Sequence, residues 1–162
     1  MKLIDLLNFS KETKDYLLGY SDEELERIEK IYDIHVCSQL ADFLRIMGKS
    51  CRGLIGDDGI QLYRSSWPAA TQLDFQQEFR NDMTKAGFGK YLNKPFVIAW
   101  LSENQYFFVQ TASDQPDLIY HYNEVEKTAK KTRWDLFGFL ESLIEDYKDS
   151  RIVNSVGELL EK

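Results

Sequence analysis

Histidine and cysteine are scarce in this chain, which narrows the chemistry that its side chains can support. The 162 residues include two histidines, His35 and His121, and two cysteines, Cys37 and Cys51. His35 and Cys37 lie close enough in the sequence to hold a metal together, but the second pair of ligands that a zinc site needs is missing. A G-x-S-x-G nucleophile motif is also missing. We therefore expect no metal, no cofactor and no catalytic residues.

Long apolar runs are missing as well. The longest ones, such as PFVIAW, are far too short to span a bilayer. The opening segment, MKLIDLLNFSKETKDY, reaches charged residues before an apolar stretch of signal-peptide length has formed. Together with the low cysteine content, these features predict a cytoplasmic protein in reducing surroundings that does not insert into membranes.

Basic residues are fewer than acidic ones. The chain has 27 Asp and Glu against 20 Lys and Arg, so its formal net charge is -7, and its sequence pI is about 4.9. Such a charge disfavours direct binding to nucleic acid or to anionic membranes and favours a basic partner. The same charge also serves solubility alone. The net charge therefore leaves a basic protein partner and a simple solubility role both open.

The apolar content that is present, 43% of the chain, is enough for one globular domain and begins with helical patterns. Residues 1–18 predict an amphipathic helix or two short ones, ending near Gly19. Ser21 and Glu24 then form a capping-box signature at the start of a helix. The predicted apolar side of that helix carries Leu25, Ile28, Ile31 and Tyr32. The next helix is predicted to bury Leu40, Phe43, Leu44 and Met47 and to end at Gly48.

The middle of the chain changes to shorter patterns. The segments RGLI and IQLYR flank a GDDG turn, which predicts a hairpin over residues 52–64. Within residues 65–94 we expect a short helix that uses Phe75, Phe79 and Met83. Strands are predicted over residues 95–100, 106–111 and 118–122, and their short connections favour an antiparallel meander.

The end of the chain returns to a helical period in RWDLFGFLESLIEDY, and a short tail helix is predicted to use Val153, Val156, Leu159 and Leu160. Helices, then strands, then a helix indicate an α+β fold, with an antiparallel meander sheet and helices packed mainly on one face. The opposite face of the sheet is then expected to be partly open.

These elements, in this order, resemble the SUKH superfamily, which includes the yeast cell-wall-assembly regulators and many bacterial immunity proteins. The resemblance covers about residues 21–148. It rests on four segments, which are similar to the family's first two helices, its apolar and aromatic strands, its next strand and its closing helix. They are ELERIEKIYDIHVCSQLADFLRIMGKSCRG, KPFVIAWLSENQYFFVQT, DLIYHYNE and WDLFGFLESLIED.

The resemblance implies a SUKH-like α+β domain over residues 21–148, between an N-terminal helical extension (1–20) and a C-terminal helical tail (149–162). It also implies an immunity protein, which binds a cognate polymorphic toxin and neutralises it by occlusion, without catalysis. A nuclease is one candidate for the toxin. Because nuclease domains need basic surfaces, this implication agrees with the acidic charge of the chain. The oligomeric state is not predicted.

The partner-binding residues are predicted from strand alternation and loop position. In YFFVQT, Phe107 and Val109 share one side of the strand, and Tyr106, Phe108 and Gln110 share the other. Tyrosines on an open sheet face suit protein recognition, because each ring offers rigid apolar area with a polar tip. We therefore predict contacts through Tyr106, Gln110, Tyr120 and Tyr122, with a charged rim of Asp57, Asp58, Asp114 and Asp117.

Two other functions compete with this interpretation. The first is an intracellular scaffold or adaptor of the same fold that binds a regulatory partner, as the yeast members suggest. The second is an enzyme that acts on a small ligand in an aromatic cleft, which would require a strongly perturbed acid or His121 to face a pocket.

Overall fold

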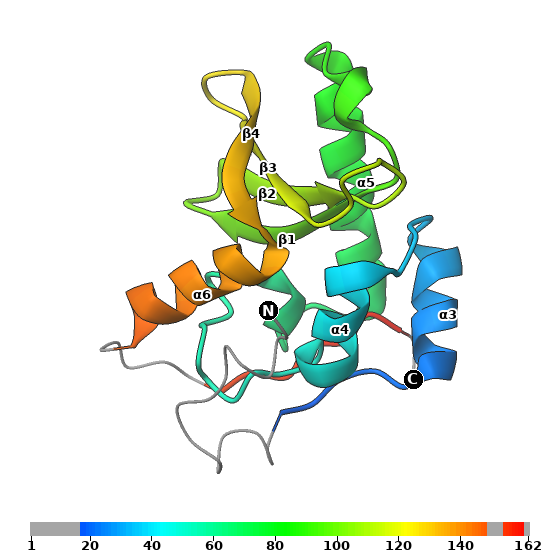
Figure 1. Cartoon of the computed structure of the whole chain (residues 1–162), viewed down its shortest axis with the longest axis vertical. Helices are drawn as coiled ribbons and strands as arrows, with labels where there is room; N and C mark the ends of the chain where they lie inside the picture. The colour runs from blue at the N-terminus through cyan, green and yellow to red at the C-terminus, as the bar shows by residue number, and fades with distance from the viewer. Residues whose placement is uncertain (1–16, 149–153, 161–162) are drawn as a thin grey trace.

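A four-stranded antiparallel sheet stands at the centre of the computed structural model, which describes residues 17–148 and 154–160 (Figure 1). Its strands follow one another in chain order as a meander, so each pairs with its sequence neighbour. They are β1 (Pro95–Leu101), β2 (Gln105–Gln110), β3 (Leu118–Asn123) and β4 (Thr128–Asp135). The predicted α+β class and antiparallel meander are confirmed.

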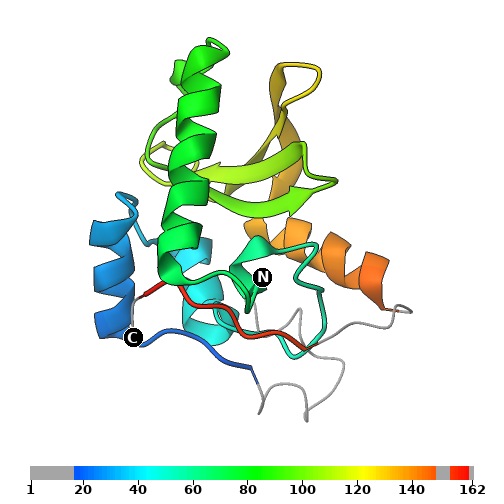
Figure 2. The same ribbon diagram turned by 180° about the vertical axis from the view of Figure 1, so that it is seen from behind.

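Helices lie on both faces of this sheet. They are α3 (Asp22–Ile31), α4 (Ser38–Met47), α5 (Ala69–Lys85) and α6 (Leu136–Tyr147), with short 3-10 turns η1 (Gln61–Tyr63) and η2 (Gly89–Tyr91). Figures 1 and 2 show α4 and α6 on one face and α5 on the other. Three of the four helices thus share one core, as expected, whereas the face that was expected to be partly open is covered by α5.

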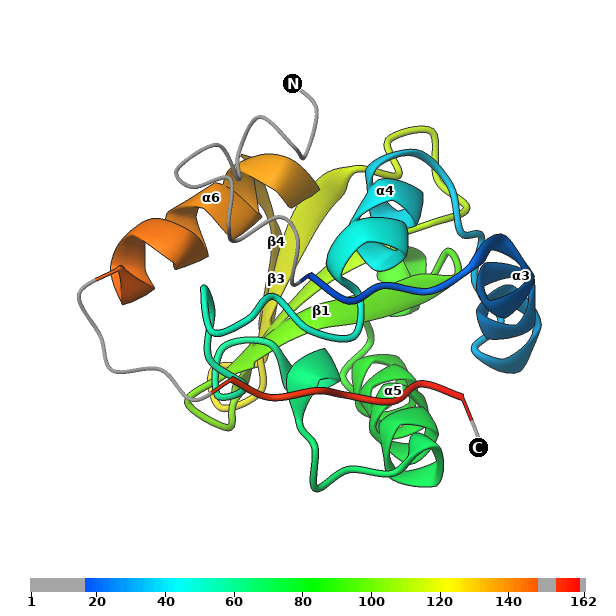
Figure 3. The same ribbon diagram turned by 90° about the horizontal axis from the view of Figure 1, so that it is seen from below.

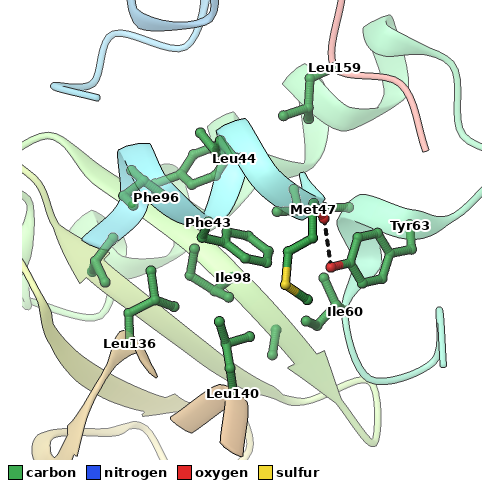
Figure 4. Close-up of a cluster of buried hydrophobic side chains, with 14 of the residues drawn as sticks. Phe43, Leu44, Met47, Ile60, Tyr63, Phe96, Ile98, Leu136, Leu140 and Leu159 are labelled. Atoms are coloured by element: carbon green, nitrogen blue, oxygen red, sulfur yellow. Dashed lines mark hydrogen bonds between the residues drawn. The ribbon is translucent and has the colours of Figure 1, made fainter. Parts of the chain in front are cut away.

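The larger core joins α3, α4 and α6 to one face of the sheet (Figure 4). Phe43 and Met47 of α4 are fully buried, and the Tyr63 hydroxyl donates a 2.8 Å hydrogen bond to the Met47 carbonyl oxygen. Leu159, from the end of the chain, is buried in the same core. This core therefore combines segments from both ends of the described chain.

The capping box predicted at the start of α3 is confirmed. The Ser21 hydroxyl accepts a 3.2 Å hydrogen bond from the Glu24 backbone N–H, and the Glu24 carboxylate accepts one of 3.0 Å from the Ser21 N–H. This second bond, with support from Lys49, lowers the pKa of Glu24. Leu25 and Ile28 are buried as predicted. The start of α3 is thus fixed by local sequence.

Replacing Ser21 with alanine is expected to lower the free energy of unfolding by about 1 kcal/mol, because the Glu24 N–H loses its side-chain acceptor. Urea denaturation at pH 7 measures the change. Ser65→Ala is the matched control, since Ser65 is exposed in a loop. An equal loss of stability in both variants would contradict the assigned role of the cap.

The hairpin predicted over residues 52–64 is wrong. This segment forms turns and η1, and its apolar residues Ile55, Ile60, Leu62 and Tyr63 are all buried instead of alternating. Cys51 holds the first turn, because its Sγ lies 3.3 Å from the Ile55 nitrogen and 3.4 Å from the Ile55 oxygen. The segment therefore packs as a core loop and adds no strand.

The helix predicted within residues 65–94 is confirmed as α5, which at 17 residues is longer than expected. Its buried side includes Phe75, Phe79 and Met83, as predicted. The three predicted strands are also confirmed, with small shifts at their ends. The fourth strand, β4, had no expected counterpart, because its TAKKTRWD sequence is mostly polar and exposed.

The described residues near the two chain ends are not helical, although helices were predicted there. The expected N-terminal helix lies outside the described residues up to residue 16, and Leu18 is not helical but forms a bridge with Ser50. Residues 154–160 are not helical either; Figure 3 shows this segment in red, running past the first turn of α5 and ending beside α3. Leu159 and Leu160 are buried by packing against other elements, so no helix is needed to cover them.

Candidate partner-binding surface

The predicted strand alternation is correct, but it places the tyrosines in a second core. Tyr106, Tyr120 and Tyr122 all lie on the sheet face that α5 covers, and the Phe79 ring of α5 lies 5.3 Å from that of Tyr106. Burial raises the pKa of Tyr106 and of Tyr120, because the ionised phenol would lose its water. The expectation that these rings line an open face is therefore wrong.

Gln110 shares this buried position. Its side-chain oxygen accepts a 3.0 Å hydrogen bond from the Asn93 side-chain amide, which ties the end of β2 to the segment before β1. With 3% of its surface exposed, Gln110 offers a partner almost no contact area. The four predicted strand contacts thus form one structural cluster beneath α5.

The four predicted acidic residues divide between the two ends of α6. Asp58 accepts a 3.1 Å hydrogen bond from the Tyr147 hydroxyl at the last residue of α6, and Asp57 accepts one of 3.1 Å from Ser155. Burial and then the Asp58 carboxylate raise the pKa of Tyr147 to about 12. These two aspartates therefore fasten the loop before η1 to the C-terminal part of the chain.

Asp117 lies at the other end of α6 and has a different task. Its carboxylate accepts hydrogen bonds from the Ser38 hydroxyl (2.8 Å) and the Gln39 N–H (3.0 Å). Asp117 therefore caps α4, because the side chain of Cys37 at the N-cap position makes no hydrogen bond to the helix. The Asp117 carbonyl oxygen accepts from the N–H of Leu136, the first residue of α6. Because α6 has 12 residues, its two ends are about 17 Å apart. The predicted acids, with Asp114 exposed beside Asp117, therefore do not form one rim.

His121 faces away from the tyrosine cluster. Its ring stacks on Phe107 at 4.7 Å, and its Nε2 lies 2.9 Å from the Gln105 side-chain oxygen. Burial lowers the pKa of His121, and the neighbouring Lys130 lowers it further. Within the described ranges, no group of three or more His, Cys, Asp or Glu is arranged to hold a metal.

A surface groove, which the sequence did not indicate, runs between α3, the start of α5 and the C-terminal segment. One end of this α3–α5 groove has a volume of about 330 Å³ and is lined by Arg27, Ile31, Ala69, Ala70, Leu73 and Leu159. The other end, of about 510 Å³, shares the two alanines. Its further lining residues are Ser65, Ser66, Trp67, Pro68, Glu158 and Leu160. The two depressions therefore adjoin at the first turn of α5.

Two aliphatic side chains stand exposed in this groove. Ile31 of α3 is 45% exposed and Leu73 of α5 is 37% exposed, although each belongs to a helix with a well-buried opposite side. Ala69 and Ala70 leave space between them, because neither side chain extends beyond Cβ. An apolar surface of this kind is typical of contact with another macromolecule or an apolar ligand.

An arginine between two tryptophans borders the groove. The Arg64 guanidinium carbon lies 4.8 Å from the ring centroid of Trp67 and 5.1 Å from that of Trp100, and both rings are half-buried. The Arg64 Nε donates a 3.2 Å hydrogen bond to the Asp57 carbonyl oxygen, so the guanidinium is held in place. Rigid tryptophan and arginine side chains are the types that dominate binding energy at protein interfaces.

The charges around the groove are mixed. Of the five carboxylates of α3, Asp22, Glu26 and Glu29 line a separate depression between α3 and α4, and Glu24 pairs with Lys49. Glu158 lines the groove itself. Arg27 is the basic side chain in the lining. The groove thus offers an apolar centre with one acidic and one basic side chain in its lining, and it can hold an apolar side chain of a partner.

The sequence carried a weak signal for this groove. Ile31 fitted the predicted apolar stripe of α3, and only the arrangement of neighbouring elements leaves it uncovered. Leu73 lies off the buried side of α5, which includes Gln72, Phe75, Gln76 and Phe79. A leucine on the polar side of an amphipathic helix is a usable hint, but it does not identify the second helix that faces it.

Comparison with known proteins adds no relative: no family model, no curated protein and no solved structure matches this chain. No helix in the described part of the chain is both long enough and apolar enough to cross a membrane.

Proposed function

We propose that this chain is a cytoplasmic immunity protein, which binds a basic toxin domain and blocks it by occlusion, without catalysis. The observation that carries the proposal is the α3–α5 groove, where Ile31 and Leu73 are exposed in an apolar lining that also includes Trp67. The resemblance of residues 21–148 to the SUKH superfamily supports the same function, because many bacterial members of that superfamily are immunity proteins.

The groove suits occlusion for two physical reasons. Its apolar centre can bury a projecting side chain of the toxin, and such central contacts supply most of the affinity of an interface. The net charge of -7 steers a basic domain toward the protein and speeds association. A toxin surface that must bind a polyanionic substrate is then covered by a rigid acidic protein.

The direct test is calorimetric titration with the inactivated C-terminal toxin domain of the exported protein encoded beside this chain. We expect tight one-to-one binding, together with protection of cells that express the active toxin. A folded toxin domain that gives no binding would contradict the proposal, and so would a genome with no such neighbour. Binding to a regulatory protein without protection would favour a scaffold of the same fold.

Truncating both exposed side chains, in the Ile31→Ala/Leu73→Ala variant, is expected to weaken toxin binding at least about tenfold, since each is a central apolar contact. The free energy of unfolding should fall by no more than about 2 kcal/mol, because each side chain is only partly buried. Val125→Ala is the matched control: Val125 is 71% exposed in the turn between β3 and β4. Unchanged affinity in the double variant would exclude the groove as the interface.

A further inference from the structure

The outer edge of β4 carries a basic surface on this acidic protein. β4 is the last strand of the sheet and pairs, among the described strands, only with β3. Its eight residues and the preceding turn include Lys127, Lys130, Lys131 and Arg133, all exposed. No carboxylate of another described residue lies within ion-pair distance of these four cations. We call this feature the β4 edge.

The cations of the β4 edge point to both faces of the sheet. Lys131 pairs with Tyr120 and therefore lies on the side of α5, whereas Lys130 pairs with His121 on the opposite side. A strand added here would thus meet positive charge above and below its backbone. The carboxylates at the two ends of β4 are set apart from this centre, because Glu126 is in the turn and Asp135 caps α6.

The first half of β4, Thr128–Lys131, pairs in regular register with β3, so its backbone is suited to accept a further strand; beyond Lys131 the register shifts. Alternate residues of an edge strand direct their N–H and C=O groups away from the sheet, where an extended segment can pair with them. The Tyr91 hydroxyl donates a 3.4 Å hydrogen bond to the Ala129 carbonyl oxygen, so η2 lies beside the start of β4. Next to it, Lys90 adds another exposed cation.

Lysines on an edge strand disfavour pairing with most other strands. They therefore restrict which kind of strand can pair with β4. A second copy of β4 in antiparallel pairing would set Lys130 and its neighbours against the same cations, which is destabilising. An apolar strand would leave these charges unpaired. An acidic strand instead gains both backbone hydrogen bonds and charge pairs.

We propose that the β4 edge binds an extended acidic peptide segment, which adds to the sheet as a fifth strand. This inference does not rest on the proposed immunity function, because β4 and the α3–α5 groove lie on well-separated parts of the molecule (Figures 1 and 3).

The test uses a blocked peptide that repeats threonine-glutamate-glutamate, so that carboxylates point to both faces. Nuclear magnetic resonance of the labelled full chain should show shift changes centred on the amides of residues 128–133, and slower hydrogen exchange there. Reversing three charges, in Lys130→Glu/Lys131→Glu/Arg133→Glu, should weaken binding at least about tenfold. Val125→Ala again serves as a control that leaves binding unchanged.

A second peptide, with the same sequence but N-methylated at alternate residues, separates strand addition from attraction between charges. It keeps every carboxylate and loses the N–H groups that pair, so we expect it not to bind. This comparison uses the original protein, so it remains valid if the charge-reversed variant fails to fold. Equal binding of the two peptides would overturn the proposal. So would no binding at about 1 mM peptide, β4 amides already protected in a dimer, or tighter binding of a single-stranded oligonucleotide at this edge.

Discussion

Replacing Gly157 with alanine is expected to expel the C-terminal segment from the core. A Cβ at this position would lie 1.6 Å from the Leu62 carbonyl oxygen and 3.0 Å from the Tyr63 Cα, and both are backbone atoms that cannot turn away. The Gly157 N–H also donates a 2.8 Å hydrogen bond to the Lys49 carbonyl oxygen, which fixes its position from the other side. The segment therefore cannot shift to make room and must leave.

The loss of stability should be large because this segment covers one side of the larger core. Leu159 and Leu160 are almost fully buried, and burying two such side chains is worth about 3–6 kcal/mol. The Leu159 backbone also joins two buried phenols, since its N–H donates to Tyr20 at 3.0 Å and its oxygen accepts from Tyr32 at 2.8 Å. We expect the free energy of unfolding of Gly157→Ala to fall by about 4 kcal/mol.

Chemical denaturation measures this loss, and limited proteolysis near residues 154–160 reports release of the segment. Gly89→Ala is the matched control, because a Cβ at Gly89 meets nothing within 4 Å. It should leave stability within about 0.5 kcal/mol of the original. A Gly157→Ala protein as stable and as protease-resistant as the control would show that the segment is not held against η1.

Local features of the fold could be predicted from the sequence. The capping box at Ser21 is a short-range signal, because both hydrogen bonds span three residues. Strand alternation is equally local: Phe107 and Val109 do face the larger core, whereas Tyr106 and Phe108 face α5. The meander followed from short connections in the same way.

Features that depend on distant contacts could not be predicted. The backbone of the C-terminal segment forms hydrogen bonds with Lys49, Tyr20 and Tyr32, which are more than a hundred residues away in sequence. The loop before η1 is apolar because it fills the core, and its sequence looked like a strand. β4 was missed because an edge strand with exposed lysines lacks the apolar alternation that identifies most strands.

The candidate site was the least predictable part. The aromatic residues of β2 and β3 indicated a recognition surface, but a helix longer than expected covers them. Ile31 looked like a core residue and is exposed, because no other element lies over that part of α3. Which apolar face remains open is decided by how elements pack together, and periodicity within one element carries no information about that.

Gln76→Leu is expected to lower the free energy of unfolding by about 3 kcal/mol, because it leaves a buried backbone N–H of β1 without a hydrogen-bond partner. Gln76 of α5 accepts a 2.9 Å hydrogen bond from the Val97 N–H and donates one of 3.1 Å to the Val97 carbonyl oxygen. Its amide therefore replaces the neighbouring strand that edge strand β1 lacks on this side. Gln61 donates to the same oxygen at 2.8 Å, so the N–H of Val97 is the group left unpaired.

Urea denaturation of Gln76→Leu and Gln77→Leu measures the effect. Gln77 is the matched control: it is the next residue of α5, it is exposed, and it donates only to Asn81 on the same helix. We expect it to change stability by less than about 0.5 kcal/mol. Similar losses in the two variants would mean that leucine is harmful at either helix position, and that Gln76 has no special role at β1.

The pH dependence of Gln76→Glu tests the same contact from the opposite direction. An ionised carboxylate accepts from the Val97 N–H but repels the Val97 carbonyl oxygen, whereas a protonated carboxyl both accepts and donates, as the amide does. Burial therefore raises the pKa of this carboxyl in the folded state above its unfolded value of about 4.3. Relative to the original protein, the variant should be most stable below pH 4 and should lose stability as the pH rises through the folded-state pKa. A stability difference that does not change with pH would show that the side chain at position 76 does not pair with both groups of Val97.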